Sequence, residues 1–535
     1  MMGYRRVFMS WRAVLGAVVV MCAASSAHAD WIHGFFSPQA GIDSIERIVH
    51  VIDTKDSTYL GITIVPAGDI NSDGLQDIIL CRQKFQSTGR DDSAFIYLGG
   101  NPPSGVPYRG FGHLRFSMAN IGDVNGDGYP DFGVQQFTIP DTLFVQIFYG
   151  GPTMDDSADF TIPNVFSLIT KAADLDNDGH LELALGDRNQ GFVRIYEVYP
   201  NPDTIPKYVI PDTSTSFGNN LVIGDFNGDH YPDLAVSAFL NRLSYQGRHP
   251  FVKFFWGGPA FDTIPDFQIN SEAEDFGQIM VALSDFNGDG YGDIFISGGS
   301  NNLYGVYFGG PAIDTILDIV ANWYDHFVPT AADEAGDINH DGYRDLVVGN
   351  AVTNLTGYVY AYLGGPIVDT ARDVYMSKFE LPGGNEMLGS EVRGVGDMNG
   401  DSIDDFAAFS VTQTVIGRGQ CDVFAGWNSV ITDVVDNEEG SLPVGCGLRQ
   451  NYPNPFNPST QIYYFTNRPG LVDVRVINQL GQTVKILVHE YLPPVSKTVQ
   501  WNAMSDATPA SSGVYYCRLS LDGVPQHSIK MLFVK

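Results

Sequence analysis

The chain has 535 residues, of which 44% are hydrophobic and 12% aromatic, so it can bury a sizeable core and is not a disordered acidic chain. Its 62 acidic residues against 30 lysines and arginines give a net charge of −32. This charge excludes electrostatic binding to nucleic acid or to an anionic membrane surface, and it favours cations as partners.

The N-terminus has the pattern of a secretory signal peptide. Arg5 and Arg6 precede an apolar run at 13–24, and a small-x-small cleavage site follows at 27–29. A membrane anchor is the alternative, but the run is short and no second apolar segment of about 20 residues appears. We therefore expect residues 1–29 to be removed, and the mature chain to have no transmembrane segment.

A nine-residue pattern rich in carboxylates, Asp-x-(Asn/Asp)-x-Asp-(Gly)-x-x-(Asp/Glu), recurs seven times. The copies begin at Asp69, Asp123, Asp174, Asp225, Asp285, Asp337 and Asp397. Their spacing of 51 to 60 residues is close to the length of one four-stranded propeller blade, and too long for the nine-residue repeats of a calcium β-helix.

Each copy is followed by an apolar run that is too short for a helix and is typical of a buried strand. The runs are 78–80, 132–134, 183–185, 234–236, 294–296, 346–348 and 406–408. A helix–loop–helix calcium hand, the alternative, would need long amphipathic flanks and a Glu at loop position 12, which is missing.

Two more strands are expected in each unit. An aromatic strand ending in Gly-Gly occurs at 97–100, 148–151, 255–258, 307–310 and 362–365, with degenerate copies at 196–199 and 424–427. Outermost strands follow at 262–269 and 314–319, where Pro and charge would protect a sheet edge.

One segment similar to an outermost strand, residues 43–49, precedes the first carboxylate loop. We expect it to pair with the last unit and so to close a ring. The alternative donor of the closing strand is 430–434, which follows the seventh unit directly.

The units resemble FG-GAP repeats, the blades of integrin α-chain propellers, over about residues 43–432. Phe217-Gly218 and Phe276-Gly277 match the "FG", and Gly-Gly-Pro at 257–259, 309–311 and 364–366 matches the "GAP" end. The resemblance implies an all-β fold, with a seven-bladed calcium-binding β-propeller over 30–432.

In such a loop, the side chains at positions 1, 3, 5 and 9 and the carbonyl of position 7 can converge on one Ca²⁺, and Gly at position 6 allows the turn. The expected ligands are Asp69, Asn71, Asp73, Asp77, Asp123, Asn125, Asp127, Asp131, Asp174, Asp176, Asp178, Glu182, Asp225, Asn227, Asp229, Asp233, Asp285, Asn287, Asp289, Asp293, Asp337, Asn339, Asp341, Asp345, Asp397, Asn399, Asp401 and Asp405. Clustered carboxylates repel one another without a counter-ion, and oxygen ligands favour Ca²⁺ over zinc or copper. We expect up to seven structural Ca²⁺; ordinary Asx-rich turns are the alternative.

Three loops depart from the pattern. The third has the longer Glu182 at position 9, the fourth has His230 at position 6, and the seventh has Ser402 at position 6. Because Ser tolerates a positive φ less well than His, the seventh loop is expected to be the weakest site.

A separate module is expected at the C-terminus. Residues 433–447 are acidic and turn-rich, which predicts a linker. Residues 448–535 predict a small immunoglobulin-like β-sandwich, with strands at 462–465, 472–478, 498–501, 514–519 and 529–534.

The module resembles the C-terminal sorting domain of type IX secretion cargo. The similar segments are NYPNPFNPST at 451–460, VINQLGQTV at 476–484 and SSGVYYCRL at 511–519. The resemblance implies outer-membrane secretion machinery as a partner, and release or attachment at the bacterial surface. An immunoglobulin-like binding domain is the alternative.

Outside the signal peptide, cysteines occur at 81, 421, 446 and 517. Export permits disulfides, with three connectivities, but buried thiols remain equally open.

The motifs favour binding over catalysis. GxSxG, HExxH and phosphate-loop motifs are absent from the sequence. We expect an adhesin-like propeller for an extracellular glycan or protein. A polysaccharide lyase or hydrolase is the alternative, because paired carboxylates leave no local motif. A purely structural surface protein is a third possibility.

The expected ligand site lies on loops opposite the carboxylate loops, where cations stand beside aromatic residues. Its candidates are Arg242, Tyr245, Arg248, Trp323 and Tyr324, with Arg82 on another loop of the same face.

Overall fold

The computed structural model of the protein describes residues 30–534 apart from the following segments: 33–34, 37–43, 54–57, 85–92, 113–117, 139–141, 164–167, 170, 188–189, 201, 213–215, 239–248, 273–275, 299–303, 312, 321–328, 353–355, 367, 369–372, 378–386, 412–417, 429–446, 449–455, 467, 479–481, 494, 504–509 and 522–523. The predicted signal peptide, the alternative closing strand and Cys446 lie outside the described residues.

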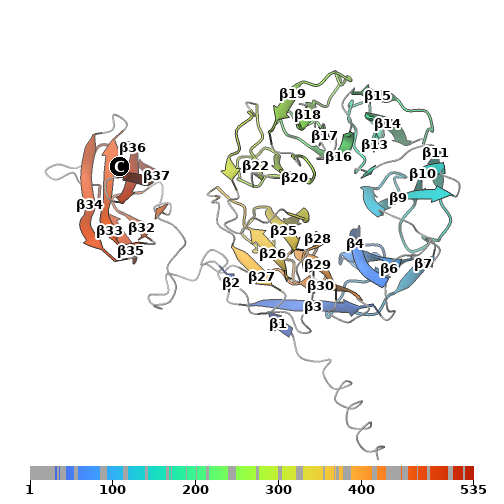
Figure 1. Ribbon diagram of the computed structural model, residues 1–535, viewed down its shortest axis with the longest axis horizontal. Helices are drawn as coiled ribbons and strands as arrows, with labels where there is room; N and C mark the ends of the chain where they lie inside the picture. The colour runs from blue at the N-terminus through green and yellow to red at the C-terminus, as the bar shows by residue number, and fades with distance from the viewer. Residues whose placement is uncertain are drawn as a thin grey trace, which may run out of the picture. The chain divides into compact units, whose positions relative to one another are not determined.

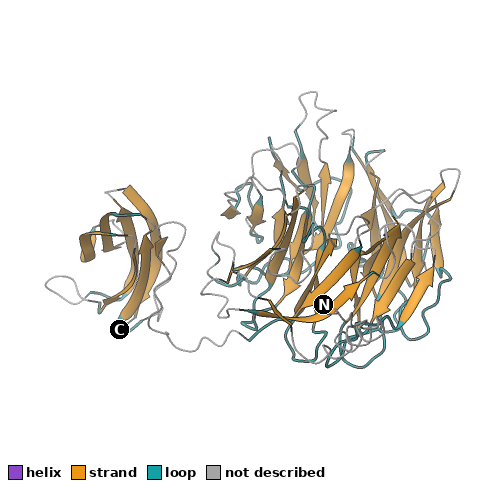
Figure 2. Ribbon diagram, turned by 60° about the horizontal axis from the view of Figure 1, so that its bottom comes forward, coloured by secondary structure: helices purple, strands orange, loops and turns teal. Residues whose placement is uncertain are grey.

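The described residues form strands and loops and no helix, so the predicted all-β class is confirmed (Figure 2). No stretch of helix able to cross a bilayer was found in this part of the chain. The chain divides into two compact units, Met1–Ile431 and Thr432–Lys535.

The described residues of the first unit form seven small antiparallel sheets, which we number in the chain order of their carboxylate loops. Sheets 1 to 3 are β4(Thr58–Gly68)-β5(Asp77–Lys84)-β6(Ser93–Tyr97)-β7(Arg109–Gly112), β8(Met118–Gly122)-β9(Asp131–Thr138)-β10(Thr142–Phe148)-β11(Phe160–Pro163) and β12(Leu168–Ile169)-β13(Leu181–Asp187)-β14(Phe192–Tyr199)-β15(Tyr208–Pro211). Sheets 4 and 5 are β16(Phe217–Gly224)-β17(Asp233–Ala238)-β18(Phe251–Phe255)-β19(Phe267–Asn270) and β20(Met280–Leu283)-β21(Asp293–Ile296)-β22(Gly305–Tyr307)-β23(Ile319–Val320). Sheets 6 and 7 are β24(Ala331–Gly336)-β25(Asp345–Val352)-β26(Thr356–Tyr362)-β27(Val374–Ser377)-β2(Phe35–Phe36) and β28(Val392–Gly396)-β29(Asp405–Val411)-β30(Gly419–Phe424)-β3(Ile45–Ile52)-β1(Asp30–Ile32).

The three kinds of strand expected from the sequence are all present. The apolar run after each carboxylate loop is the second strand of a sheet, and it is almost completely buried because both of its faces are covered by neighbouring sheets. Aromatic strands ending in Gly-Gly are third strands, and the predicted segments 262–269 and 314–319 overlap the beginnings of the outer strands β19 and β23.

The N-terminal segment supplies the outer strand of sheet 7, as predicted. Strand β3 pairs antiparallel with β30, with Val49 opposite Val423 and Val51 opposite Cys421. The last sheet is therefore completed by residues from the start of the chain.

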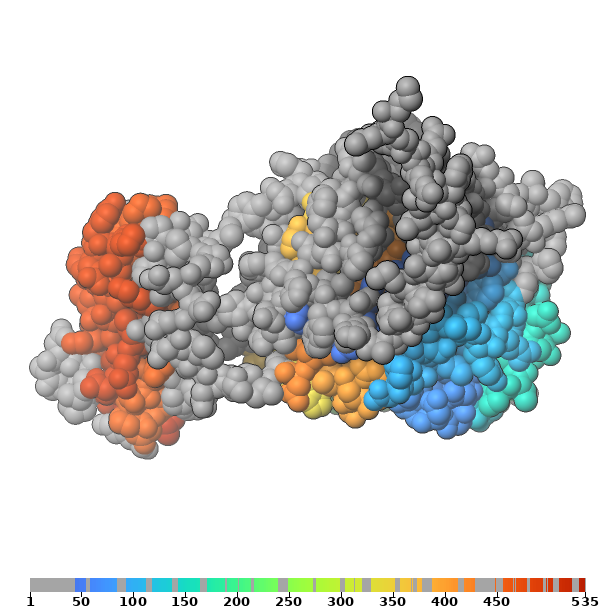
Figure 3. All heavy atoms as spheres, turned by 90° about the horizontal axis from the view of Figure 1, so that it is seen from below, coloured from blue at the N-terminus to red at the C-terminus, as the bar shows by residue number. Residues whose placement is uncertain are grey.

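The first and last sheets also contact each other directly. The Gly100 N–H donates to the carbonyl of Met398 at 2.7 Å, and the Gln76 N–H donates to the carbonyl of Asp397 at 2.9 Å. Val49 and Leu80 belong to one apolar cluster that joins sheets 7 and 1. Figure 1 shows the sheets of this unit arranged around a ring, and Figure 3 shows the blue residues of sheet 1 beside the orange residues of sheet 7.

The second unit consists of two sheets around one core. They are β31(Gly447–Leu448)-β32(Thr460–Thr466)-β35(Val495–Trp501) and β34(Thr483–Leu492)-β33(Gly470–Asn478)-β36(Gly513–Leu521)-β37(Val524–Phe533). Trp501 of the smaller sheet packs edge-to-face on Tyr515 of the larger one, at 5.1 Å between ring centroids. The five strands expected in this module are present.

The described cysteines bear out the buried-thiol alternative. Cys81, Cys421 and Cys517 are buried thiols, and burial raises the pKa of the Cys517 thiol to about 12.

Candidate metal centres

Seven hairpin loops carry the repeated carboxylates, each joining the first strand of a sheet to the second. We number them loop 1 to loop 7, and their residues positions 1 to 9. The backbone is left-handed at positions 4 and 6 of every loop, with φ between 55° and 93°. His230 and Ser402 adopt this conformation at position 6, as the pattern requires. The left-handed backbone at position 4 was not predicted, although the residues found there are Gly, Asn, Ser and His.

Hydrogen bonds within each loop hold the carboxylates in place. In loop 1, Asp69 accepts the N–H groups of Asp73 at 3.1 Å and Gly74 at 2.8 Å. The side-chain carbonyl of Asn71 also accepts the Asp73 N–H, at 3.0 Å, and Asp73 accepts the Leu75 N–H at 2.9 Å. Nine consecutive residues thus suffice to gather the oxygens at the hairpin tip.

The position-9 carboxylate is buried at the base of the loop. In loop 2, Asp131 accepts the N–H groups of Val124 at 2.7 Å and Gly150 at 2.8 Å. Burial is the main cause that raises the pKa of Asp131 to about 6, of Asp293 to about 7 and of Asp405 to about 8, and the other loop carboxylates add to it. The negative charge at position 9 therefore lacks a sufficient counter-charge within the loop.

This donor set fits a hard divalent cation. Apart from loop 3, each loop offers carboxylate, amide and carbonyl oxygens at positions 1, 3, 5, 7 and 9 and no nitrogen or sulfur ligand there; His230 and His340 stand at other positions. Each carboxylate oxygen has lone pairs beyond those that accept backbone N–H groups. Calcium prefers six to eight such oxygens and would neutralise the clustered charge.

The Gly-Gly signature belongs to the same centres. In loops 1, 2 and 4 to 7, the N–H of a glycine at the end of the third strand donates to the position-9 carboxylate. A Cβ on Gly150 would lie 1.9 Å from the carbonyl oxygen of Pro130, and one on Gly309 would lie 1.9 Å from that of Gly292. Only glycine brings the third strand this close to position 8.

We expect Gly150→Ala to destabilise the protein by about 3 kcal/mol, because the added methyl group overlaps the carbonyl of Pro130. Gly105→Ala is the matched control, since its Cβ would meet no atom closer than 3.9 Å. Urea unfolding of the two variants in calcium would measure the difference. Equal midpoints would contradict the steric role of the first glycine.

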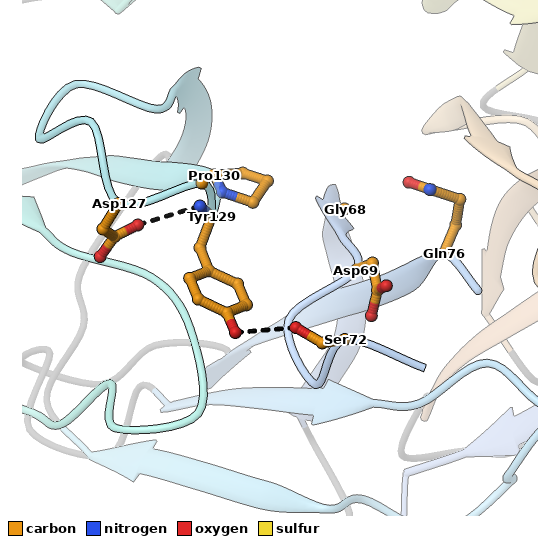
Figure 4. A pocket seen from close by; sticks show the side chains of 8 residues that line it. Gly68, Asp69, Ser72, Gln76, Asp127, Tyr129 and Pro130 are labelled. Atoms are coloured by element: carbon orange, nitrogen blue, oxygen red, sulfur yellow. Dashed lines mark hydrogen bonds between the residues drawn. The ribbon is translucent and has the colours of Figure 1, made fainter. Parts of the chain in front are cut away.

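Adjacent loops contact one another. The second glycine of a Gly-Gly pair donates to the position-2 carbonyl of the preceding loop, as in Gly258 to Leu175 at 2.8 Å. The hydroxyl of Tyr129 in loop 2 lies 2.7 Å from the hydroxyl of Ser72 in loop 1 (Figure 4). A pocket of about 500 Å³ lies between these loops, with Asp69 among its lining residues. The loops therefore form a connected row.

Loop 3 has a different environment, because it contains a lysine ammonium. Lys207 Nζ lies 2.7 Å from Asp176, 2.7 Å from Asp178 and 2.9 Å from Glu182. Burial opposes its charge, but the three carboxylates raise the pKa of Lys207 above its ordinary value. Asp174, Asp176 and Glu182 also offer oxygens within 4.8 Å of one another, so by distance alone they could hold a metal ion.

Every expected calcium ligand is described, and each set of four lies in one loop. The expected ligand-binding residues Arg242, Tyr245, Arg248, Trp323 and Tyr324 lie outside the described residues. Arg82, considered with them, does not fit that role. Its side chain is only 10% exposed and lies 2.9 Å from Asp53, so it is not free to meet a ligand.

The comparisons with known proteins agree with the repeat. The family described as FG-GAP-like repeat matches residues 174–236, which include loops 3 and 4. The chain is 25% identical to integrin alpha-PS3 of Drosophila melanogaster over 41% of this chain and 22% of that one. It is 28% identical to integrin alpha-8 of Mus musculus over 27% of this chain and 16% of that one.

The chain thus matches less than a quarter of the length of these relatives. A crystal structure of BBS1N in complex with ARL6DN, soaked with lead, matches 75% of this chain and 98% of that one, at 13% identity and a TM-score of 0.39. That score carries no argument. The FG-GAP-like repeat at 174–236 and the integrin α similarity support an FG-GAP β-propeller.

Proposed function

We propose that residues 30–432 form a seven-bladed β-propeller whose hairpin loops hold structural Ca²⁺, and that this domain binds an extracellular glycan or protein without catalysing a reaction. The observation that carries the proposal is the same oxygen arrangement at the tip of one hairpin per sheet. In each loop, backbone N–H groups hold these oxygens in place. Neighbouring loops contact each other through other groups, such as the N–H of Gly258 and the carbonyl of Leu175.

The ions would supply positive charge and rigidity. Asp, Asn and the position-7 carbonyl would hold each ion, and no chemical step at the metal is required. A rigid row of loops on one side leaves the opposite loops to present the ligand site. Arg242, Tyr245, Arg248, Trp323 and Tyr324 are its proposed residues, since cations beside aromatic side chains can bind acidic glycans or acidic protein segments.

The second unit is proposed to be an immunoglobulin-like sorting domain. Its two sheets with one shared core support the sandwich. The motifs at 451–460, 476–484 and 511–519 support recognition by outer-membrane secretion machinery. With residues 1–29 as signal peptide, 30–432 as propeller, 433–447 as linker and 448–535 as sorting domain, the protein would be released or attached at the bacterial surface.

Binding of the purified protein to a panel of glycans and matrix proteins tests this function. We expect saturable binding to one acidic class, loss of binding in chelator, and at least about tenfold weaker binding for Arg242→Ala with Trp323→Ala. Tyr108→Ala, which removes a 57% exposed aromatic side chain elsewhere on the unit, should bind as the wild type does.

Two outcomes would contradict the proposal. Release of product from a polysaccharide would indicate the lyase or hydrolase instead. Absence of binding across the whole panel would favour a structural surface protein.

A further inference from the structure

Loop 3 differs from the other loops at two positions, and both of these side chains contact the same lysine. Position 3 is Asp176 where the others have Asn, and position 9 is Glu182 where the others have Asp. Both side chains contact Lys207, which lies 25 residues beyond Glu182.

A backbone hydrogen bond shows which position of sheet 3 Lys207 occupies. Its N–H donates to the carbonyl of Ile195 on the third strand, at 2.8 Å. The residues that make the equivalent bond in sheets 2, 4, 5 and 6 are Asp159, Asp266, Asp318 and Asp373. In those sheets the carboxylate accepts the N–H of the residue before Gly-Gly, at 2.8 to 2.9 Å. Sheet 3 thus has a positive charge where four other sheets have a negative one.

The ammonium uses its three donors on the loop. Each of its contacts, to Asp176, Asp178 and Glu182, is shorter than 3.0 Å. The Tyr208 hydroxyl adds a bond to Asp176 at 2.7 Å. A lysine has three N–H donors, so its hydrogen-bonding capacity is met within this loop.

The longer side chain at position 9 fits the same arrangement. Glu182 still accepts the position-2 N–H of Leu175 at 2.9 Å, and its other oxygen reaches Lys207. Sheet 3 lacks the glycine that donates to this oxygen in other sheets: Val198 and Tyr199 stand there, and the strand register shifts between Leu181 and Glu182. The lysine thus replaces the glycine N–H as the partner of position 9.

We propose that the ammonium of Lys207 is the resident cation of loop 3, and that this loop takes no Ca²⁺. A divalent ion among the same oxygens would have to displace an ammonium that already bonds to three of the four carboxylates and offsets part of their charge, and the two cations would repel each other. The inference rests on the proposed calcium function of the other loops. It reduces the calcium capacity from seven to six, and it makes loop 3 independent of calcium.

Native mass spectrometry of the full chain at saturating Ca²⁺ tests this, with position 5 changed in two neighbouring loops. Asp178→Asn in loop 3 should retain the wild-type calcium count, whereas Asp229→Asn in loop 4 should lose one ion. If either position-5 variant does not fold, a second matched pair at position 1, Asp174→Asn and Asp225→Asn, replaces it.

The outcomes separate the two proposals. Loss of one ion from Asp178→Asn or Asp174→Asn, as in loop 4, would overturn the role of Lys207. A wild-type count of seven would overturn it as well. A protein that binds no calcium at all would refute the proposed function itself, and with it the count of six.

Discussion

Removal of divalent cations is expected to lower the melting temperature of the Met1–Ile431 unit by roughly 10 to 20 °C. An ion present at one hundred times its dissociation constant stabilises the folded state by about 2.7 kcal/mol per site, and several loops act together. Without the ions, carboxylates such as Asp293 and Asp405 stay buried with like charges beside them. Calorimetry in chelator and in saturating Ca²⁺ measures the shift.

The second unit provides an internal control for this experiment. Its buried Asp473 is already paired with Arg475 at 2.5 Å and with His489 at 2.7 Å, so its transition should not respond to chelator. A melting temperature of the first unit that is the same in chelator and in calcium would contradict structural metal binding.

Replacement of Arg82 by Met is expected to destabilise the first unit by about 3 to 5 kcal/mol, because it leaves a buried charge without its partner. Asp53, just beyond β3, has a fully buried side chain. Arg82 of β5 contacts both of its oxygens at 2.9 Å, and the Thr58 hydroxyl donates to it at 2.6 Å. The pair therefore fastens the closing strand of sheet 7 to sheet 1. Urea unfolding in saturating Ca²⁺ measures the loss.

Two variants make this test specific to burial. Arg344→Met removes an ion pair with Asp404 in which the arginine is 46% exposed, and it should cost less than about 1 kcal/mol. Arg82→Met combined with Asp53→Leu should recover part of the loss, because no unpaired buried charge remains. Equal costs for Arg82→Met and Arg344→Met would show that the Arg82 pair does not hold the ring closed.

The sequence alone determined the parts of this protein that depend on consecutive residues. Nine residues position the loop oxygens through bonds such as that from Gly74 to Asp69, so the candidate sites could be predicted from spacing. Apolar runs of about three residues predicted the buried second strands, since both faces of these strands are covered. The donor of the closing strand was also predictable, because residues 43–49 resemble an outer strand but have no unit of their own before them.

Only the tertiary structure decided which residues far apart in the sequence form ion pairs or close contacts. No local pattern places Lys207 in loop 3, because its position depends on the pairing of β14 with β15. Likewise, only the structure shows that Arg82 is buried against Asp53 and is not available to a ligand. It also shows why the first residue of Gly-Gly is glycine: the carbonyl of position 8 lies too close for a Cβ. Electrostatic and steric contacts depend on distance in space, which the order of residues along the chain does not contain.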